Sequence, residues 1–407
     1  MEYDLVFEGG GAKGMVFVGA MQEFERRGHT CKRLLGTSAG AITAALLAAG
    51  YTAEEMRAAL GEQENGRSVF TSFMAQPGPF DKDQVLKGVT LAFLRDLDLP
   101  FIPNFIENRL DEKLVEWLST DPKLSSSFSL LEYGGWYSAD HFVAWLKRRL
   151  DTGENRGQPR RYSAMNLKQF HEATGCDLSM VASDTTAGMM LVLNHRTAPD
   201  LPLVWAVRMS MSIPLLWQEV IWRPEWGQYR GRDMAGHAIV DGGLLSNFPI
   251  ELFISQEPFV RNLMGPEAGQ SVLGMKIDES LPVIPGQVGP ASAQTTGLGQ
   301  APLLRRIKNL VDTTLSARDK LVSEAAEKLV VRLPAGGYGT TEFDMTEERR
   351  NLLVSAGCDT LRRYFDALEA QAEQGAVSFS PEDVARQIEE EERLKRQADK
   401  VALKILQ

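Results

Sequence analysis

The first fifty residues alternate between apolar runs and glycine-rich breaks, and this pattern predicts strands and helices in turn. Residues 4–8 (DLVFE) predict a short buried strand, and residues 15–28 predict a helix that follows a glycine loop. Residues 33–36 (RLLG) predict a second, very short strand, and the small residues at 41–50 predict a second helix. The order strand, loop, helix, strand, turn, helix is typical of the start of an α/β layered fold.

The pattern changes over residues 52–150, where helical stretches rich in aromatic side chains are broken by Pro and Gly. We interpret this segment as a helical insertion on the α/β core. Its aromatic part, residues 70–117, fits either a lid or wall that contacts lipid, or a second small hydrophobic core.

The remaining chain predicts further strands and helices and a separate C-terminal helix. The expected elements are two adjacent strands within 176–195, a helix over 203–213, strands over 237–243, 271–277 and 328–334, and helices over 303–326 and 346–374. Residues 284–302 contain no charged side chain and predict a mobile surface loop. We therefore expect one domain over residues 1–375, followed by a charged helix with an apolar stripe over residues 380–407.

Composition excludes several classes of protein. The 407 residues are 43% hydrophobic and carry a net charge of −10, which disfavours a nucleic-acid binder and any long-range attraction to anionic lipid. Cys31, Cys176 and Cys358 are far apart and form no CxxC pair, so neither a zinc site nor a disulfide framework is indicated. The N-terminus lacks signal-peptide features, and no apolar window reaches about 18 residues. A cytoplasmic location is the expectation, with secretion that needs no N-terminal signal as the alternative.

The sequence GTSAG at residues 36–40 presents a candidate nucleophile. Ser38 lies between a predicted strand and a predicted helix, which is the context of a G-x-S-x-G nucleophile elbow. Gly36 and Gly40 leave room for the sharp turn, and the amide dipoles of the following helix would favour a developing oxyanion. The alternative is a Gly-Ser turn that simply begins a helix.

The glycine run GGGAKG at residues 9–14 suggests an anion-binding loop. Gly9, Gly11 and Gly14 formally make a GxGxxG pattern, but the second strand ends without the acidic residue that a dinucleotide site requires. A P-loop would need Ser or Thr after the Gly-Lys pair, and neither is present. The nucleotide interpretation is therefore weak.

An oxyanion hole fits the glycine run better. The backbone N–H groups of Gly10 and Gly11 could point at an acyl oxygen held over Ser38, because glycine allows close approach and unusual φ values. We expect Lys13 in the same loop to be an ordinary exposed residue.

None of the five histidines follows a turn in the way that a triad histidine does, so another base is needed. Asp241 ends a predicted strand and is followed by Gly242 and Gly243, which permit a tight turn. Functional groups gather at the carboxyl ends of parallel strands, where we expect both Ser38 and Asp241. An aspartate can act as general base within hydrogen-bond reach of the hydroxyl, and burial would raise its pKa toward a useful value. The alternative is a turn-capping aspartate.

Three other features leave alternatives open. Arg208, in AVRMSMSIP, either orders backbone near the site or is a surface residue on a helix. Asp184 is either a second acid or a strand-end cap. Residues 147–161 hold six basic and two acidic residues, which suits either lipid headgroups or a solvated face.

Taken together, GGGAKG, GTSAG, DGG and the segment AVRMSMSIPLLW resemble the bacterial type of the patatin-like phospholipase family, in the family's order. The resemblance implies a three-layer α/β/α patatin-like fold with a mainly parallel central sheet and a helical insertion. It also implies a serine acyl hydrolase that cleaves phospholipids or lysophospholipids through an acyl-enzyme, without metal or cofactor. Ser38 would be the nucleophile, Asp241 the base, and Gly10 and Gly11 the oxyanion hole. DGG replaces the commoner DGA without changing this chemistry.

Two alternatives to this activity remain at the level of sequence. One is hydrolysis of another acyl lipid, such as a triacylglycerol or a glycolipid, and the other is a non-catalytic lipid- or nucleotide-binding protein on the same fold. The expected partners are an acyl-lipid substrate and a membrane surface contacted peripherally, with an activating protein or a second copy of the chain as further candidates. No nucleic-acid partner is expected.

Overall fold

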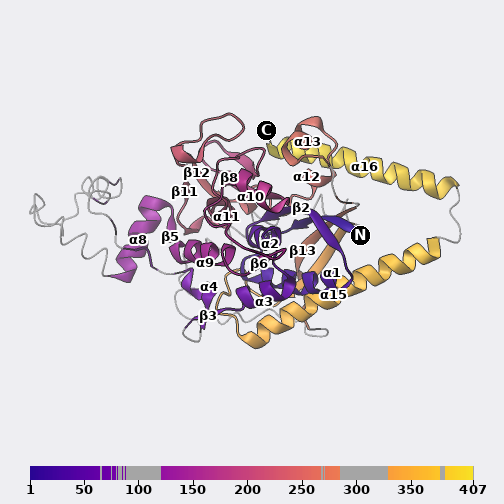
Figure 1. Ribbon diagram of the computed structural model, residues 1–407, viewed down its shortest axis with the longest axis horizontal. Coiled ribbons are helices and arrows are strands. Elements are labelled where there is room, and N and C mark those ends of the chain that lie inside the picture. The colour runs from indigo at the N-terminus through magenta and orange to yellow at the C-terminus, as the bar shows by residue number, and fades with distance from the viewer. Residues whose placement is uncertain are drawn as a thin grey trace, which may run out of the picture.

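The computed structural model is shown in Figure 1. It describes residues 1–64, 67–74, 76–78, 80, 85, 88, 121–266, 269, 271–284, 329–375 and 381–406. The loop predicted from residue 284 onward, the helix predicted over 303–326 and most of the aromatic stretch at 70–117 therefore lie outside the described residues.

A central sheet of eight strands organises the molecule, and five neighbouring strands in it run parallel, in the order β8-β2-β1-β13-β14. Their bounds are β1 Glu2–Phe7, β2 Thr30–Thr37, β8 Asp177–Asp184, β13 Ser271–Pro282 and β14 Val330–Gly336. The other three are antiparallel additions beside β8, namely β9 Met189–Leu193, β11 Val220–Ile221 and β12 Ala238–Asp241. The mainly parallel sheet expected from the sequence is thus confirmed.

Helices cover both faces of this sheet and make three layers. In Figure 1, α1, α3 and α15 lie on one side of it, and α12, α13 and α16 lie on the other. The first layer contains α1 Met15–Arg26, α2 Ala39–Ala48, α3 Ala53–Leu60, α9 Asp140–Leu150, α11 Leu203–Ser210 and α15 Glu347–Gly375. The second contains α12 Glu251–Ile254, α13 Pro258–Met264 and α16 Pro381–Leu406.

Shorter elements complete the described chain. They are the helices α4 Val69–Ser72, α8 Pro122–Tyr133 and α10 Leu167–Thr174, the 3-10 turns η1 Gly11–Gly14, η2 Pro224–Trp226 and η3 Gly242–Leu244, and three small strand pairs: β3 Gln63–Glu64 with β4 Arg67–Ser68, β5 Gly135–Tyr137 with β10 Leu215–Trp217, and β6 Glu154–Asn155 with β7 Gln158–Pro159.

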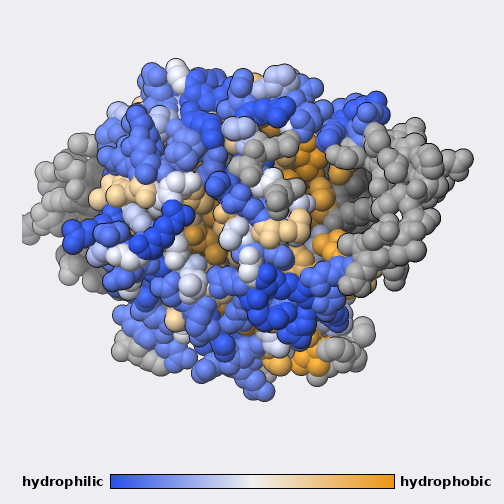
Figure 2. All heavy atoms as spheres, turned by 45° about the vertical axis from the view of Figure 1, so that its right-hand side comes forward, coloured by the Kyte–Doolittle hydropathy of each residue, from blue (hydrophilic) through white to orange (hydrophobic). Residues whose placement is uncertain are grey.

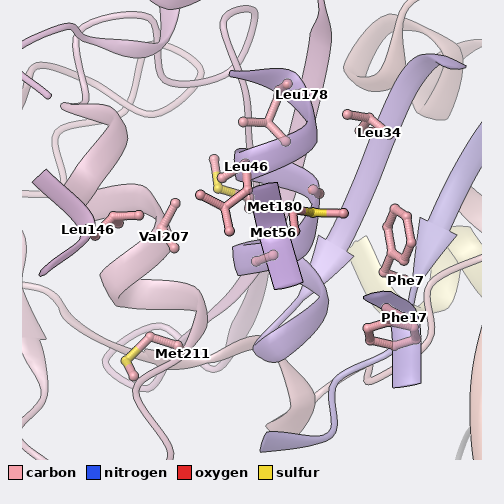
Figure 3. Packing of buried hydrophobic residues seen from close by; sticks show 14 of the residues in the cluster. Phe7, Phe17, Leu34, Leu46, Met56, Leu146, Leu178, Met180, Val207 and Met211 are labelled. Carbon is pink, nitrogen blue, oxygen red and sulfur yellow. The ribbon is translucent and has the colours of Figure 1, made fainter. Parts of the chain in front are cut away.

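The strand sequences explain the two covered faces. Successive side chains of a strand point to opposite faces, and β1 places Leu5 and Phe7 in the core under α1 while Val6 faces the other layer. The Phe7 ring meets Phe17 of α1 edge to face, with ring centroids 5.4 Å apart (Figure 3). A parallel strand buried on both faces reads as a continuous apolar run, which is why DLVF was recognisable.

The C-terminal helix α16 packs on the second layer rather than standing free. Ala398, Ala402 and Leu406 are buried in the cluster that also contains residues of α12 and α13. The carboxylate of Asp399 accepts hydrogen bonds from the Ser255 hydroxyl at 2.6 Å and from the Gln256 amide at 2.8 Å. These contacts fix one register of α16 against the core.

The surface of the molecule is mostly polar on the face shown in Figure 2. Apolar side chains appear there mainly in recessed patches. Among the described residues, no helix is long and apolar enough to cross a bilayer.

Candidate active site

Ser38 occupies a sharp turn between β2 and α2, as the sequence predicts. Its backbone has φ 54° and ψ −119°, a conformation that residues other than glycine rarely adopt. A residue held in such a conformation at the end of a strand is typical of a strained functional turn. Ser38 is also the N-cap of α2, so the first N–H groups of that helix point toward the space around Ser38.

Close packing around this turn requires glycine. A Cβ atom on Gly40 would lie 2.3 Å from the carbonyl oxygen of Phe7, and one on Gly36 would lie 2.3 Å from the carbonyl oxygen of Gly40. The start of α2 therefore rests directly on the ends of β1 and β2. Any larger residue at either position would push the turn away from the sheet.

A residue that sequence reasoning missed supports Ser38 from α11. The Ser38 amide donates to the hydroxyl of Ser210 at 3.1 Å, and that hydroxyl donates to the carbonyl of Val181 at 2.6 Å. Ser210 is fully buried. Its position in the segment AVRMSMSIP, which the sequence analysis singled out, was the only available signal.

Asp241 ends β12, but not for the reason that the sequence suggested. We expected it at the carboxyl end of a parallel strand, whereas β12 runs antiparallel to β8. Asp241 pairs with Ala182, and the neighbouring Val181 pairs with Thr37 of β2. β12 begins beside the end of β8 and is only four residues long, so its last residue is still near the edge where β2 ends. Asp241 and Ser38 therefore lie at the same edge of the sheet.

The Asp241 carboxyl is buried and incompletely hydrogen-bonded. Its Oδ1 accepts the Gly243 amide at 2.8 Å, while its Oδ2 is buried without a hydrogen-bond partner of ordinary geometry. Burial raises the pKa of Asp241 to about 7, against the opposing influence of the Ser38 hydroxyl and the Gly243 amide, which favour the charged form. The Ser38 hydroxyl is therefore close enough to the Asp241 carboxyl to influence its pKa, although no hydrogen bond of ordinary geometry joins them.

The glycine loop runs beside Ser38. Gly9 exchanges hydrogen bonds with Asn247, whose side-chain amide donates to the Gly9 carbonyl at 3.0 Å and whose own carbonyl accepts the Gly9 amide at 3.0 Å. A Cβ atom on Gly9 would lie 3.1 Å from the Cβ of Ser38. The loop is therefore held within contact distance of Ser38 by the segment that follows Asp241.

Two amides of this loop are available to a ligand. In the described part of the chain, the N–H groups of Gly10 and Gly11 donate to no protein acceptor. Gly11 has φ +55°, and a Cβ atom there would lie 2.1 Å from the Thr340 carbonyl oxygen. Only glycine fits this position, and Ala12, the next residue, is fixed by donating to that same carbonyl at 2.9 Å.

The other motif glycines pack closely as well. A Cβ atom on Gly14 would lie 2.9 Å from that of Ala39, and one on Gly242 would lie 2.3 Å from the Val181 carbonyl oxygen. Gly243 is buried in the turn η3.

The expectation that Lys13 is exposed is wrong. Its side chain is 6% exposed and forms an ion pair with Glu279 of β13. The charge of the glycine loop is therefore neutralised by a partner 266 residues away in the sequence.

Arg208 is buried rather than on the surface. It donates to the carbonyls of Gln218 at 2.9 Å and Ser138 at 3.2 Å, and also to the Ser212 hydroxyl. Burial lowers the pKa of Arg208 to about 10. The Ser212 carbonyl in turn accepts the Asp241 amide at 2.8 Å. Of the two alternatives for Arg208, the structure supports the one in which it orders backbone near the site.

Asp184 and the histidines take structural roles. Asp184 accepts the amides of Thr186 and Ala187 at the end of β8 and the imidazole of His237 at 2.7 Å, as a strand-end cap would. His171 and His195 stack on each other with ring centroids 3.7 Å apart. None of the five histidines of the chain is hydrogen-bonded to Ser38 or Asp241.

The basic segment at 147–161 offers less free charge than its sequence suggests. Arg148 and Arg149 both pair with Glu62, and Arg160 is 2% exposed and bonded to Glu55. Half of its six basic side chains are thus engaged within the protein.

A largely apolar pocket opens beside the turn. It encloses about 490 Å³, including the space at its mouth, and Gly11 and Ala39 line the end next to Ser38. Its apolar lining comes from Met15, Ile42, Leu60, Phe70, Phe343 and Met345. Within the described residues, no group of three or more His, Cys, Asp or Glu side chains could hold a metal ion.

The chain is similar in sequence to a known protein family. The family model described as patatin-like phospholipase matches residues 5–254. The uncharacterized protein YqhO of Bacillus subtilis (strain 168) is 26% identical over 364 residues, which are 88% of this chain and 96% of YqhO. The probable lipid hydrolase 463L of Invertebrate iridescent virus 6 is 20% identical over 250 residues, 61% of this chain and 62% of the viral protein.

Solved structures were also matched. VipD from Legionella pneumophila is 17% identical, with a TM-score of 0.43 over 90% of this chain and 67% of VipD. ExoU of Pseudomonas aeruginosa, in its complex with SpcU, is 16% identical, with a TM-score of 0.35 over 90% of this chain and 51% of the matched chain. This chain spans about half the length of ExoU. The family model covers more than half of the chain and contains all three motifs that form the site, so the protein belongs to the patatin-like phospholipase family.

Proposed function

We propose that this protein is a serine acyl hydrolase that cleaves acyl esters of phospholipids or lysophospholipids with a Ser38–Asp241 dyad. Membership of the family supports the broader class, a lipid acyl hydrolase. The observation that carries the finer proposal is the buried Oδ2 of Asp241, which lacks a partner and lies beside the hydroxyl of a strained serine. An unpartnered buried carboxylate oxygen costs stability, and a proton-accepting role explains why it is kept.

The chemistry follows from this arrangement. Asp241 takes the proton of the Ser38 hydroxyl as the Oγ attacks the ester carbonyl. The negative charge that develops on the carbonyl oxygen is stabilised by the amides of Gly10 and Gly11. Protonated Asp241 then gives its proton to the leaving alcohol, which leaves an acyl group on Ser38. Water, deprotonated by Asp241, releases the acid and restores the hydroxyl.

A base with a pKa of about 7 suits this task. An aspartate at its ordinary pKa of about 3.9 would be too weak a base to accept a proton from a hydroxyl efficiently. Burial of Asp241 removes much of that mismatch. The same carboxyl is then a strong enough acid to protonate the leaving group, so one residue serves both half-reactions.

The apolar pocket supports a lipid acyl group as the part of the substrate that is bound. Its lining is mostly aliphatic and aromatic, as in sites that bind apolar ligands. Because Gly11 and Ala39 line the end that borders Ser38, an acyl chain in the pocket would bring its carbonyl to the hydroxyl.

We also propose that the protein works from the cytoplasm at a lipid surface. Leu124 and Leu131 on α8 are 44% and 69% exposed, and Leu215 and Ile221 on β10 and β11 are 39% and 50% exposed. Leu215 pairs with Gly135, just after α8 in the sequence, so β10 lies next to the end of α8. Exposed apolar side chains of this kind support contact with a membrane surface or an activating protein.

A fluorophosphonate probe, which phosphonylates activated serines, tests the proposal. We expect the probe to label the wild type and the control Ser163→Ala, whose serine is hydrogen-bonded to Asp151, but not Ser38→Ala. Asp241→Asn should hydrolyse a phospholipid at least a hundredfold more slowly than the wild type, the scale of a lost general base. Hydrolysis that survives in Ser38→Ala would overturn the proposal.

A further inference from the structure

The pocket beside Ser38 contains an arginine that has no partner among the residues the structure describes. Arg350, in the first turn of α15, lines the pocket and is 7% exposed. In the described part of the chain, its guanidinium makes no ion pair, hydrogen bond or cation–π contact. The guanidinium nitrogens of Arg350 are not fully buried, so they remain accessible although the residue as a whole is buried.

The neighbouring charges do not balance it. Glu342 is the carboxylate of the pocket lining, and its oxygens already accept from Arg349 at 2.7 Å and from the Gly339 amide at 3.0 Å. Lys13, the cation of the glycine loop, is neutralised by Glu279. The pocket wall therefore keeps one uncompensated positive charge on Arg350.

A buried cation without a partner is costly, and proteins generally pair it. The pocket gives this cation access to a ligand, and the planar guanidinium matches two oxygens of a phosphate or carboxylate at once. An acyl chain alone would gain nothing from it. The occupant that explains both the apolar lining and the free guanidinium is a molecule with an acyl chain and an anionic group close to its ester.

We propose that Arg350 binds the phosphate of the lipid substrate, and this inference rests on the proposed acyl-hydrolase function. In a glycerophospholipid the phosphate and the nearest ester oxygen are attached to adjacent or next-nearest glycerol carbons, so both can be held in one pocket. Arg350 is then a specificity-determining residue that selects phospholipids and lysophospholipids over neutral glycerides with the same acyl chains.

The test compares two substrates in detergent micelles: a lysophospholipid and the monoacylglycerol with the same acyl chain. Arg350→Gln should lower kcat/KM for the lysophospholipid at least tenfold, the size of a lost charge-assisted hydrogen bond, and change that for the monoacylglycerol less than twofold. Arg350→Lys, which keeps the charge without the planar fork, should restore part of the loss. Arg363→Gln, an exposed arginine on the same helix, is the control and should change neither substrate.

The outcomes separate the inference from what it rests on. Equal losses on both substrates would mean that Arg350 is only structural, and no loss on either would mean that it binds nothing; both overturn the proposal. If inorganic phosphate inhibits the wild type but not Arg350→Gln while the substrate ratio stays unchanged, the anion is free phosphate, and the proposal is again wrong. Ser38→Ala and Asp241→Asn are assayed on the monoacylglycerol in parallel, and activity that survives there refutes the dyad instead.

Discussion

Replacing Asp241 by asparagine should stabilise the folded protein in a way that depends on pH. The carboxyl is fully buried, and its pKa is raised from 3.8 to about 7. A raised pKa means that the folded state binds a proton more tightly than the unfolded chain does. The contribution of Asp241 to stability is therefore complete below about pH 4 and is lost as the pH rises through about 7.

The magnitude follows from the same shift. One pH unit of difference in pKa corresponds to about 1.4 kcal/mol, so keeping Asp241 ionised in the folded state costs on the order of 4 kcal/mol. When the pH rises from 5 to 8, the free energy of unfolding of the wild type should fall by about 2–3 kcal/mol relative to that of Asp241→Asn. Asparagine keeps an oxygen that can accept the Gly243 amide, and its new N–H₂ group faces the Ser38 hydroxyl, so the variant should fold.

Equilibrium unfolding in urea, followed by tryptophan fluorescence at pH 5, 6, 7 and 8, measures this difference. Taking the difference between the two proteins cancels the titration of every other group. Asp233→Asn is a matched control, because Asp233 also accepts the amide two residues ahead, that of Ala235 at 3.0 Å, but is exposed. The control measures the effect of replacing a turn aspartate that is not buried. A difference between wild type and Asp241→Asn that stays constant within about 0.5 kcal/mol would refute a raised pKa for Asp241.

Three further predictions concern the site. Since Asp241 must be ionised to act as base, kcat/KM for a soluble ester should rise with pH to a plateau with a midpoint near 7, and a flat profile between pH 5 and 8 would contradict this. Ser210→Ala leaves the buried Ser38 amide without its acceptor and should lower kcat about tenfold at little changed KM, whereas Ser210→Thr should retain most activity; steady-state kinetics distinguishes them. Gly11→Ala should abolish hydrolysis and lower the melting temperature more than Gly157→Ala, which has a positive φ but open space around it.

The sequence predicted the fold well because local patterns carry it. The buried strands DLVF and VVRLP, the helix at 15–28 and the turn at Ser38 all follow from short stretches whose pattern leaves few alternatives. The family resemblance is confirmed by the match over residues 5–254. Element ends were less accurate: the second strand begins at Thr30 rather than Arg33, because Thr30 and Cys31 pair with β1 although the side chains of Thr30 and Lys32 are exposed.

The sequence could not predict features that depend on long-range pairing. The direction of β12 was wrong because nothing in HAIVD distinguishes a parallel strand from an antiparallel one, and the direction shows only in the pairing of β12 with β8 and β11. Lys13 was expected to be exposed because Glu279 lies on a strand far away in the chain. Arg350 has no motif around it at all, and its interest arises only from the absence of a partner among the described residues.

One short segment connects the two residues of the proposed dyad. Ser210 accepts the amide of Ser38, and two residues later the carbonyl of Ser212 accepts the amide of Asp241. Arg208 fixes the end of that segment by bonding to the Ser212 hydroxyl and to two carbonyls outside the helix. The backbones of Ser38 and Asp241 are therefore both tied to this one segment. This explains how the buried Asp241 carboxyl is held near the strained Ser38 although β12 has only four residues.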